Sequence, residues 1–245
     1  MNPAPPVRLY LLDIEGTVAP LTLTSGVLFP YARRHFEEFL RERSKDDDVH
    51  ADLALLAEEN RAETDLSCPK IAGAPGLDFE TWEGSALRYL LWLMDRDRKS
   101  TALKSLQGKI WKAGFESGEL KGTFFPDVPP ALERWSKIAR VAIYSSGSVE
   151  AQQLLFSHST AGDLTPLLSG YFDTRTGAKT ASASYAAIAE TMQVATGEIL
   201  FLSDVVRELD AAREAGCRTR LVVRPGYAPV EDARGHAVLR TFENV

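Results

Sequence analysis

The chain has 245 residues, a formal net charge of −6 and 25% charged residues. These values are ordinary for a globular enzyme, and the negative charge argues against a nucleic-acid surface, which needs clustered Lys and Arg. The opening "MNPAPPVR" lacks the apolar stretch of a signal peptide, and the longest apolar run, residues 89–94, is too short to cross a membrane. We therefore expect a cytoplasmic protein with no nucleic-acid or membrane partner.

The first predicted element is a buried strand over residues 7–12, which is dense in Val and Leu. It ends at "LDIEGT", where Asp13 and Glu15 stand one residue apart. Two carboxylates at the mouth of a buried strand have two explanations. They cap a turn, or they hold a positively charged group.

Four helical segments follow, over residues 29–43, 51–63, 79–96 and 101–113, with apolar residues at helical spacing and no strand signal between them. The stretches "SKDDD" (44–48) and "AGAPG" (72–76) are typical of solvated turns. More than 100 residues without a strand are too many for one crossover connection. The pattern predicts an inserted helical unit over residues 20–123.

The remainder alternates between short apolar strands (141–144, 199–202, 221–223) and helical patterns (149–158, 182–194, 205–215). Strands without polar alternation indicate a parallel sheet covered on both faces. The fold class we predict is therefore α/β, with a doubly wound, Rossmann-like parallel-sheet core. Residues 1–19 and 124–245 form this core, and residues 20–123 form the helical cap.

Polar residues follow the ends of these strands, where an open parallel sheet binds its ligands. They are Asp13, Glu15, Ser145, Ser146, Lys179, Asp204 and Glu208. The carboxylates would repel one another in a cleft, and Mg²⁺, which takes one or two carboxylates plus waters and a phosphate, relieves that repulsion. Serine hydroxyls and amides at a helix start suit an anion, and a lysine adds a positive charge. Together these residues indicate phosphoryl transfer.

Each residue alone has a structural explanation. Asp13, Asp204 and the serines of "SSGS" could cap turns or helices, Lys179 could be an ordinary surface lysine, and Glu208 could lie on a solvated helix face. The combination in this order, each member at a strand end, is far more specific than any one of them.

The motifs resemble those of the haloacid-dehalogenase-like hydrolases: "DIEGT" with Asp13, Glu15 and Thr17, then Ser145, Lys179, and Asp204 with Glu208. Most phosphatases of that superfamily have Asp where this chain has Glu15. With that departure, "YSSGSVEAQQLLF" (144–156), "FDTRTGAKTASASY" (172–185) and "FLSDVVRELDAAREAG" (201–216) are similar to the enolase-phosphatases of methionine salvage, the acireductone synthases.

The resemblance implies a Mg²⁺-dependent enzyme with one Mg²⁺ per site, and we expect a monomer. Its substrate would be 2,3-diketo-5-methylthiopentyl 1-phosphate, which it would enolise and dephosphorylate to an acireductone. Asp13, Asp204 and the backbone carbonyl of Glu15 would hold the metal, and Ser145, Ser146 and Lys179 would hold the substrate. Catalysis would fall to Asp13 as nucleophile, Glu15 as acid and base, and Lys179 as the balancing charge. The enolising base stays open between Glu15 and a cap residue such as Glu119.

Three alternatives remain. A haloacid dehalogenase on this fold needs no acidic residue at position 15 and no metal, so Glu15, Asp204 and Glu208 argue against it. A phosphatase of this type acting on another small phosphate ester would keep the same core residues. A scaffold without catalytic activity would have no need of Asp13, Lys179 and Asp204.

Overall fold

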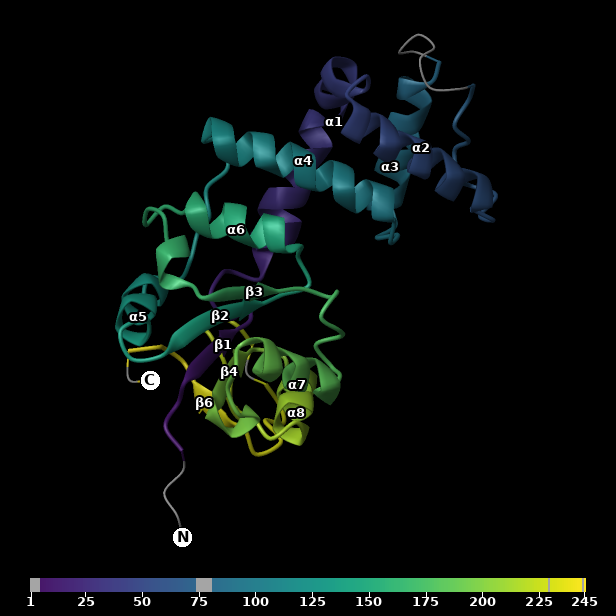
Figure 1. Ribbon diagram of the computed structural model, residues 1–245. Helices are drawn as coiled ribbons and strands as arrows, with labels where there is room; N and C mark the ends of the chain where they lie inside the picture. The colour runs from purple at the N-terminus through teal and green to yellow at the C-terminus, as the bar shows by residue number, and fades with distance from the viewer. Residues whose placement is uncertain (1–4, 74–80, 229, 244) are drawn as a thin grey trace. The chain divides into compact units, whose positions relative to one another are not determined.

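The computed structural model describes residues 5–73, 81–228, 230–243 and 245. The chain divides into two compact units, Met1–Leu23 with Gly118–Val245, and Thr24–Ser117. Figure 1 colours the second unit from blue to teal. The sequence-based limits of the helical unit, 20–123, and its role as a cap stay predictions.

The first unit is built on a parallel sheet of six strands in the order β3-β2-β1-β4-β5-β6. The strands are β1 (Leu9–Leu12), β2 (Arg140–Tyr144), β3 (Gly170–Phe172), β4 (Ile199–Ser203), β5 (Arg218–Val222) and β6 (Ala237–Leu239). The predicted α/β fold with a parallel sheet is confirmed. Sequence analysis missed β3 and β6, which are edge strands of three residues each and too short for a periodic pattern.

Strand β1 lies in the middle of the sheet, between β2 and β4. Leu12, its last residue, pairs in register with Ile143 of β2 and with Leu202 of β4. The residues that follow these three strands therefore leave the sheet at one level. This register brings the sequence-predicted polar residues to the same edge.

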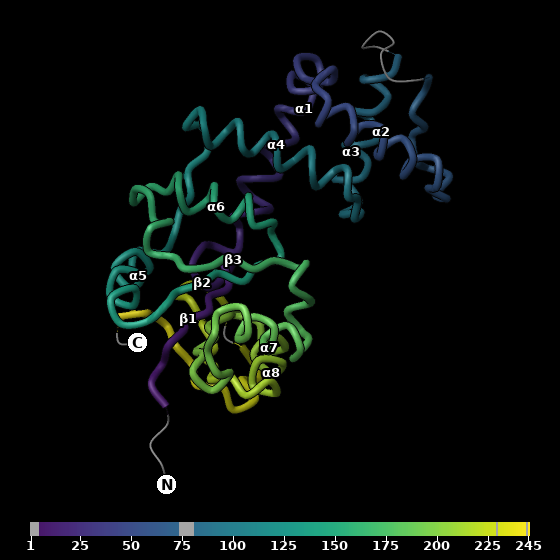
Figure 2. Tube along the Cα trace, in the orientation of Figure 1, coloured from purple at the N-terminus to yellow at the C-terminus, as the bar shows by residue number. Residues whose placement is uncertain are grey.

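Helices cover both faces of this sheet (Figures 1 and 2). They are α5 (Val128–Trp135), α6 (Val149–Ser157), α7 (Ser182–Thr191) and α8 (Val206–Glu214), with short 3₁₀ turns η2 (Thr165–Leu167) and η3 (Thr196–Glu198). Leu9 and Leu11 of β1 belong to one apolar cluster with Ile188 of α7 and Leu209 of α8. On the alternate residue of β1, the Tyr10 ring stacks on Trp135 of α5 at 4.5 Å, as expected for a strand covered on both faces.

The predicted helices of this unit are found at α6, α7 and α8, within a few residues of their expected ends. Helix α5 was not predicted. Its sequence, "VPPALERW", carries two prolines directly after Val128, and proline is compatible with the first turn of a helix.

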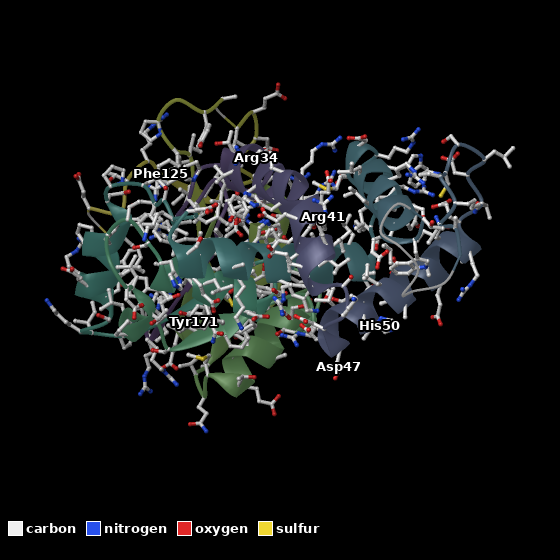
Figure 3. The ribbon with its side chains drawn as sticks, turned by 90° about the horizontal axis from the view of Figure 1, so that it is seen from above. Arg34, Arg41, Asp47, His50, Phe125 and Tyr171 are labelled. Carbon is white, nitrogen blue, oxygen red and sulfur yellow. The ribbon has the colours of Figure 1, made fainter. Side chains whose placement is uncertain are left out.

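The second unit contains η1 (Leu23–Leu28, a π-helical turn that begins at the boundary residue), α1 (Phe29–Arg43), α2 (Asp47–Ala62), α3 (Glu83–Asp95) and α4 (Thr101–Ser117). Helix α4 packs against α1 and α2. Figure 3 labels Arg34 and Arg41 on α1 and Asp47 and His50 on α2.

Helix α2 begins four residues earlier than predicted, so the expected turn at 44–48 is partly helical. Asp46 precedes the helix, and Asp47 and Asp48 lie in its first turn, where negative charge is favourable. Of the predicted turn at 72–76 and helix at 79–96, residues 74–76 and 79–80 lie outside the described residues. In the described part of the chain, no helix combines the length and apolarity that a membrane span requires.

Candidate active site

A tight loop places Asp13 at the carboxyl end of β1. The Asp13 amide still donates to the carbonyl oxygen of Leu202 in β4 at 3.0 Å, and the amides of the next turn, including that of Val18, converge on the carbonyl oxygen of Ile14. Gly16 makes the turn with φ of +72°, a region that favours glycine. The Asp13 side chain is consequently held at the strand mouth and is 9% exposed.

Lys179 is the cation of the site. Its Nζ donates to Asp13 Oδ1 and lies 2.7 Å from Glu208 Oε2, and its side chain is only 10% exposed. Burial alone would lower the pKa of Lys179, but the carboxylates of Asp13 and Glu208 raise it above its ordinary value. The ammonium therefore stays charged, and Lys179 is not the surface lysine that the sequence left open.

Two buried tyrosines fix the backbone and surroundings of Lys179. The Tyr185 hydroxyl donates to the carbonyl oxygen of Lys179 at 2.7 Å and lies 3.1 Å from that of Glu208. The Tyr144 hydroxyl donates to the carbonyl oxygen of Gly177 at 2.9 Å, and Lys179 Nζ lies 5.9 Å from the centre of the Tyr144 ring. The lysine is thus built into the core of the unit, which keeps its charge in place.

Asp204 follows β4 and meets the β1 loop through Thr17. The Asp204 amide donates to Thr17 Oγ1 at 3.0 Å, and Thr17 Oγ1 lies 3.5 Å from Asp13 Oδ2. A Cβ on Gly16 would overlap the Asp204 carboxylate, which shows how closely this loop approaches Asp204. Burial, and then the negative charge of Asp13, raise the pKa of Asp204 to about 7.

The two carboxylates fit a magnesium ion. Among the described residues there is no cluster of three His, Cys, Asp or Glu side chains suited to a metal. Mg²⁺ does not need one, because one or two carboxylates suffice beside waters and a phosphate. Asp204 Oδ1 is buried without a hydrogen-bond partner in the described structure, and its raised pKa shows that a neighbouring cation would be favourable there. Asp13 and Asp204 supply the two carboxylates, and the Glu15 carbonyl as a third ligand stays a prediction.

The serine loop follows β2, the strand next to β1. The Ser145 amide donates to the carbonyl oxygen of Phe172 at 3.1 Å, and Ser145 Oγ accepts the Gly147 amide at 3.3 Å. Ser148 caps α6, since its hydroxyl accepts the Ala151 amide at 3.3 Å. Ser145 is half-buried and Ser146 is exposed. Ser148 is therefore the residue that caps α6, and Ser145 lies at the carboxyl end of β2.

The structure brings together Asp13, Lys179, Asp204 and Glu208, and places Glu15 and the serines at the same end of the sheet. Glu208 is a partner of Lys179, and Ser203 Oγ donates to Glu208 Oε2 at 2.9 Å. Sequence analysis gave no role to Thr17, although it quoted the residue in "DIEGT". Tyr144 and Tyr185 were also missed, because their contacts join segments far apart in sequence and leave no local pattern.

Comparisons with known proteins agree with this geometry. The sequence model of the haloacid dehalogenase-like hydrolases matches residues 7–216. Enolase-phosphatase E1 of Synechococcus elongatus is 53% identical over 226 residues, which cover 92% of each chain. Enolase-phosphatase E1 of Salmo salar is 44% identical, covering 94% of this chain and 91% of the relative. The solved structure of the UTR4 protein of Saccharomyces cerevisiae is 34% identical with a TM-score of 0.77, covering 98% of this chain and 100% of that one.

The chain belongs to the haloacid dehalogenase-like hydrolases and, within them, to the enolase-phosphatase E1 family. The sequence-based prediction of a phosphatase is thereby confirmed. The enolase-phosphatase relatives also argue against the two alternatives of a dehalogenase and of a scaffold without catalytic activity.

Proposed function

We propose that this chain is the enolase-phosphatase of methionine salvage and converts 2,3-diketo-5-methylthiopentyl 1-phosphate to an acireductone and phosphate. The observation that carries the proposal is the buried Asp13–Lys179 pair beside Asp204. A carboxylate nucleophile, a fixed cation and a second carboxylate meet there at the end of a parallel sheet. Relatives named enolase-phosphatase E1 over nearly the full chain support this choice of substrate.

Asp13 is the nucleophile of the dephosphorylation. A carboxylate oxygen attacks phosphorus, an aspartyl-phosphate forms, and the bond from phosphorus to the leaving oxygen breaks. Glu15 donates a proton to that oxygen. Glu15 then takes a proton from water, which attacks the aspartyl-phosphate and releases inorganic phosphate and free Asp13.

Lys179 and the serines hold charge and position. The ammonium of Lys179 offsets the negative charge that accumulates on Asp13 and the phosphoryl group. Ser145, Ser146 and the amides of their loop donate hydrogen bonds to phosphoryl oxygens. Asp13, Asp204 and the Glu15 carbonyl would hold Mg²⁺, which would supply charge neutralisation at the phosphoryl group and Lewis acidity toward the diketone.

Enolisation precedes dephosphorylation. A base removes a proton from the carbon next to a carbonyl group, and the carbonyl oxygen becomes the enol oxygen. Glu15 and Glu119 are the candidate bases.

We further propose a monomer in the cytoplasm with one Mg²⁺ per site.

The test separates the two steps. Asp13→Asn lacks the nucleophile, so we expect enol absorbance without free phosphate when this variant, in the presence of Mg²⁺, meets the diketone phosphate. Glu15→Gln should reduce phosphate release, and should reduce enol formation as well where Glu15 is the shared base. Should the parent protein release phosphate from simple esters as fast as from the diketone phosphate, with no enol at any time, the enolase activity is refuted and a phosphatase for another small ester stands.

A further inference from the structure

Arg224 lies two residues after β5 with a side chain that is only 2% exposed. Its Nε donates to the carbonyl oxygen of Thr17 at 2.8 Å, and its Nη1 donates to Asp127 Oδ2 at 2.7 Å. The guanidinium carbon lies 4.4 Å from the centre of the Phe125 ring and 4.2 Å from that of Phe242. Figure 3 labels Phe125, which precedes α5. None of the side chains proposed above to hold metal or substrate is among these contacts.

The shape of the guanidinium is necessary for these contacts. A planar group can stack between two rings while its edge donates hydrogen bonds in two fixed directions. A lysine ammonium carries the same charge but can neither stack in this way nor aim two donors from one plane. The site therefore uses the geometry of Arg224 as well as its charge.

Asp127 holds the guanidinium in one orientation. Its Oδ2 accepts hydrogen bonds from Arg224, from the Phe242 amide at 2.7 Å and from Thr241 Oγ1 at 3.1 Å. The start of α5 and the C-terminal segment are thereby joined around Arg224. This framework leaves Nε directed at the loop that follows β1.

Thr17 connects this framework to the reacting groups. Arg224 binds its carbonyl oxygen, while its hydroxyl accepts the Asp204 amide and lies 3.5 Å from Asp13. One residue thus receives the guanidinium on its backbone, while its side chain touches the Asp13 carboxylate and the Asp204 backbone amide. A shift of the Thr17 peptide would move the hydroxyl relative to Asp13 and Asp204 together.

We propose that Arg224 is a positioning residue for phosphoryl transfer: through the Thr17 peptide it sets the distance between Asp13 and Asp204. The inference rests on the proposed function, because it assigns the two carboxylates to nucleophile and metal binding. It adds a residue that lies 207 positions from Thr17 in the sequence.

The test is Arg224→Lys, which keeps the charge and leaves the core filled. We expect kcat to fall by about tenfold to a hundredfold, as small misplacements of reacting groups do, and the Mg²⁺ concentration for half-maximal activity to rise about tenfold. The Michaelis constant for substrate should stay within about twofold of the parent value, because the serine loop is untouched. All values are taken per folded molecule, below the melting temperature.

A double-mutant cycle with Thr17→Val tests whether Arg224 acts through the Thr17 hydroxyl. The valine removes the hydroxyl and keeps the shape of the side chain. If Arg224 acts through that hydroxyl, Arg224→Lys in the Thr17→Val background should lower kcat by no more than about threefold further. Fully multiplicative effects would overturn the route through Thr17.

Arg134→Ala is the matched control. Arg134 also donates to the C-terminal segment, to the carbonyl oxygen of Phe242 at 2.6 Å, and within the described part of the chain its hydrogen bonds go to that segment and not to the loop after β1. We expect a lower melting temperature with kcat at the parent value. Should Arg134→Ala reduce kcat as strongly as Arg224→Lys, loosening of the C-terminal segment would be the cause and the inference would be wrong.

Two substrates distinguish a failure of this inference from a failure of the proposed function. Activity is measured on the diketone phosphate and on p-nitrophenyl phosphate, so loss of the first alone overturns the substrate and leaves Arg224 testable on the second. The rise in melting temperature caused by Mg²⁺ is measured as well, and it should be smaller in Arg224→Lys than in the parent. A variant with parent kcat and parent response to Mg²⁺ overturns the role of Arg224.

Discussion

Replacing Asp204 by asparagine should stabilise the metal-free protein at neutral and higher pH. Burial and the charge of Asp13 raise the pKa of Asp204 from 3.8 to about 7, so the folded state holds a proton that the unfolded state releases. The stability contributed by this proton is fully present below about pH 3.8 and is lost as pH rises through about 7. The asparagine side chain does not titrate in this range, so the free energy of unfolding of the variant does not decrease in this way as pH rises.

The magnitude follows from the shift. One pKa unit corresponds to about 1.4 kcal/mol, so the shift of Asp204 sets an upper limit of about 4 kcal/mol. Because Asp204 is only half-buried, solvent screening reduces this to about 2 kcal/mol. For a chain of this size, 2 kcal/mol corresponds to a melting-temperature difference of about 4–8 °C.

The assay is thermal unfolding in EDTA at about pH 5 and about pH 8, for wild type and Asp204→Asn. The difference, variant minus wild type, should be positive at the higher pH and should shrink at the lower. Adding Mg²⁺ at the higher pH should reverse the order, because the wild type gains binding free energy and the variant gains little. An asparagine variant that is less stable than wild type in EDTA at both pH values would refute the reasoning.

Asp127→Asn provides a control of opposite sign. Burial alone would raise the pKa of Asp127, but hydrogen bonds from the Phe242 amide and from Arg224 bring it below its ordinary value. Its carboxylate therefore contributes stability above the unfolded pKa of 3.8, which is lost as pH falls through the lower folded value. Asp127→Asn should be less stable than wild type at both assay values, with or without Mg²⁺.

Two further substitutions test the geometry around the carboxylates. Gly16→Ala should lower activity and melting temperature, since a Cβ there would overlap Asp204. Gly162→Ala is the control, because φ is +92° there and nothing lies within 4 Å of the added Cβ. This control measures the backbone strain alone, which costs about 1–2 kcal/mol. Tyr185→Phe leaves buried carbonyl oxygens, including that of Lys179, without their donor and should cost about 1–3 kcal/mol in urea unfolding. An unchanged unfolding midpoint would show that these contacts add nothing to stability.

The central strands and most helices of the core were predictable because their signals are local. Residues 199–202 form an unbroken apolar run, and both faces of that strand are covered. Strand β6 shows the limit, since its first two residues are exposed and its place is fixed by pairing with β5. A pairing between segments distant in sequence leaves no periodic pattern in either one.

The candidate site divides in the same way. Asp13 and Asp204 were found because each follows a strand, and parallel strands deliver their carboxyl ends to one edge. Arg224 also follows a strand, yet nothing in "VVRPG" shows that its guanidinium turns back toward Thr17. Residues that touch ligand can be found from strand ends, whereas residues that act through others need the contacts themselves.

The charge balance of the site explains why a cation belongs beside Asp204. The carboxylates of Asp13, Asp204 and Glu208 lie around Lys179, and the Lys179 ammonium pairs with those of Asp13 and Glu208. Asp204 lies outside both ion pairs and retains a buried oxygen without a partner in the described structure. Burial and then the repulsion from Asp13 raise its pKa to about 7, and the positive charge of Lys179 offsets this only in part. A divalent ion at that place would replace the proton and lower the repulsion from Asp13, so magnesium affinity should increase with pH as Asp204 loses its proton.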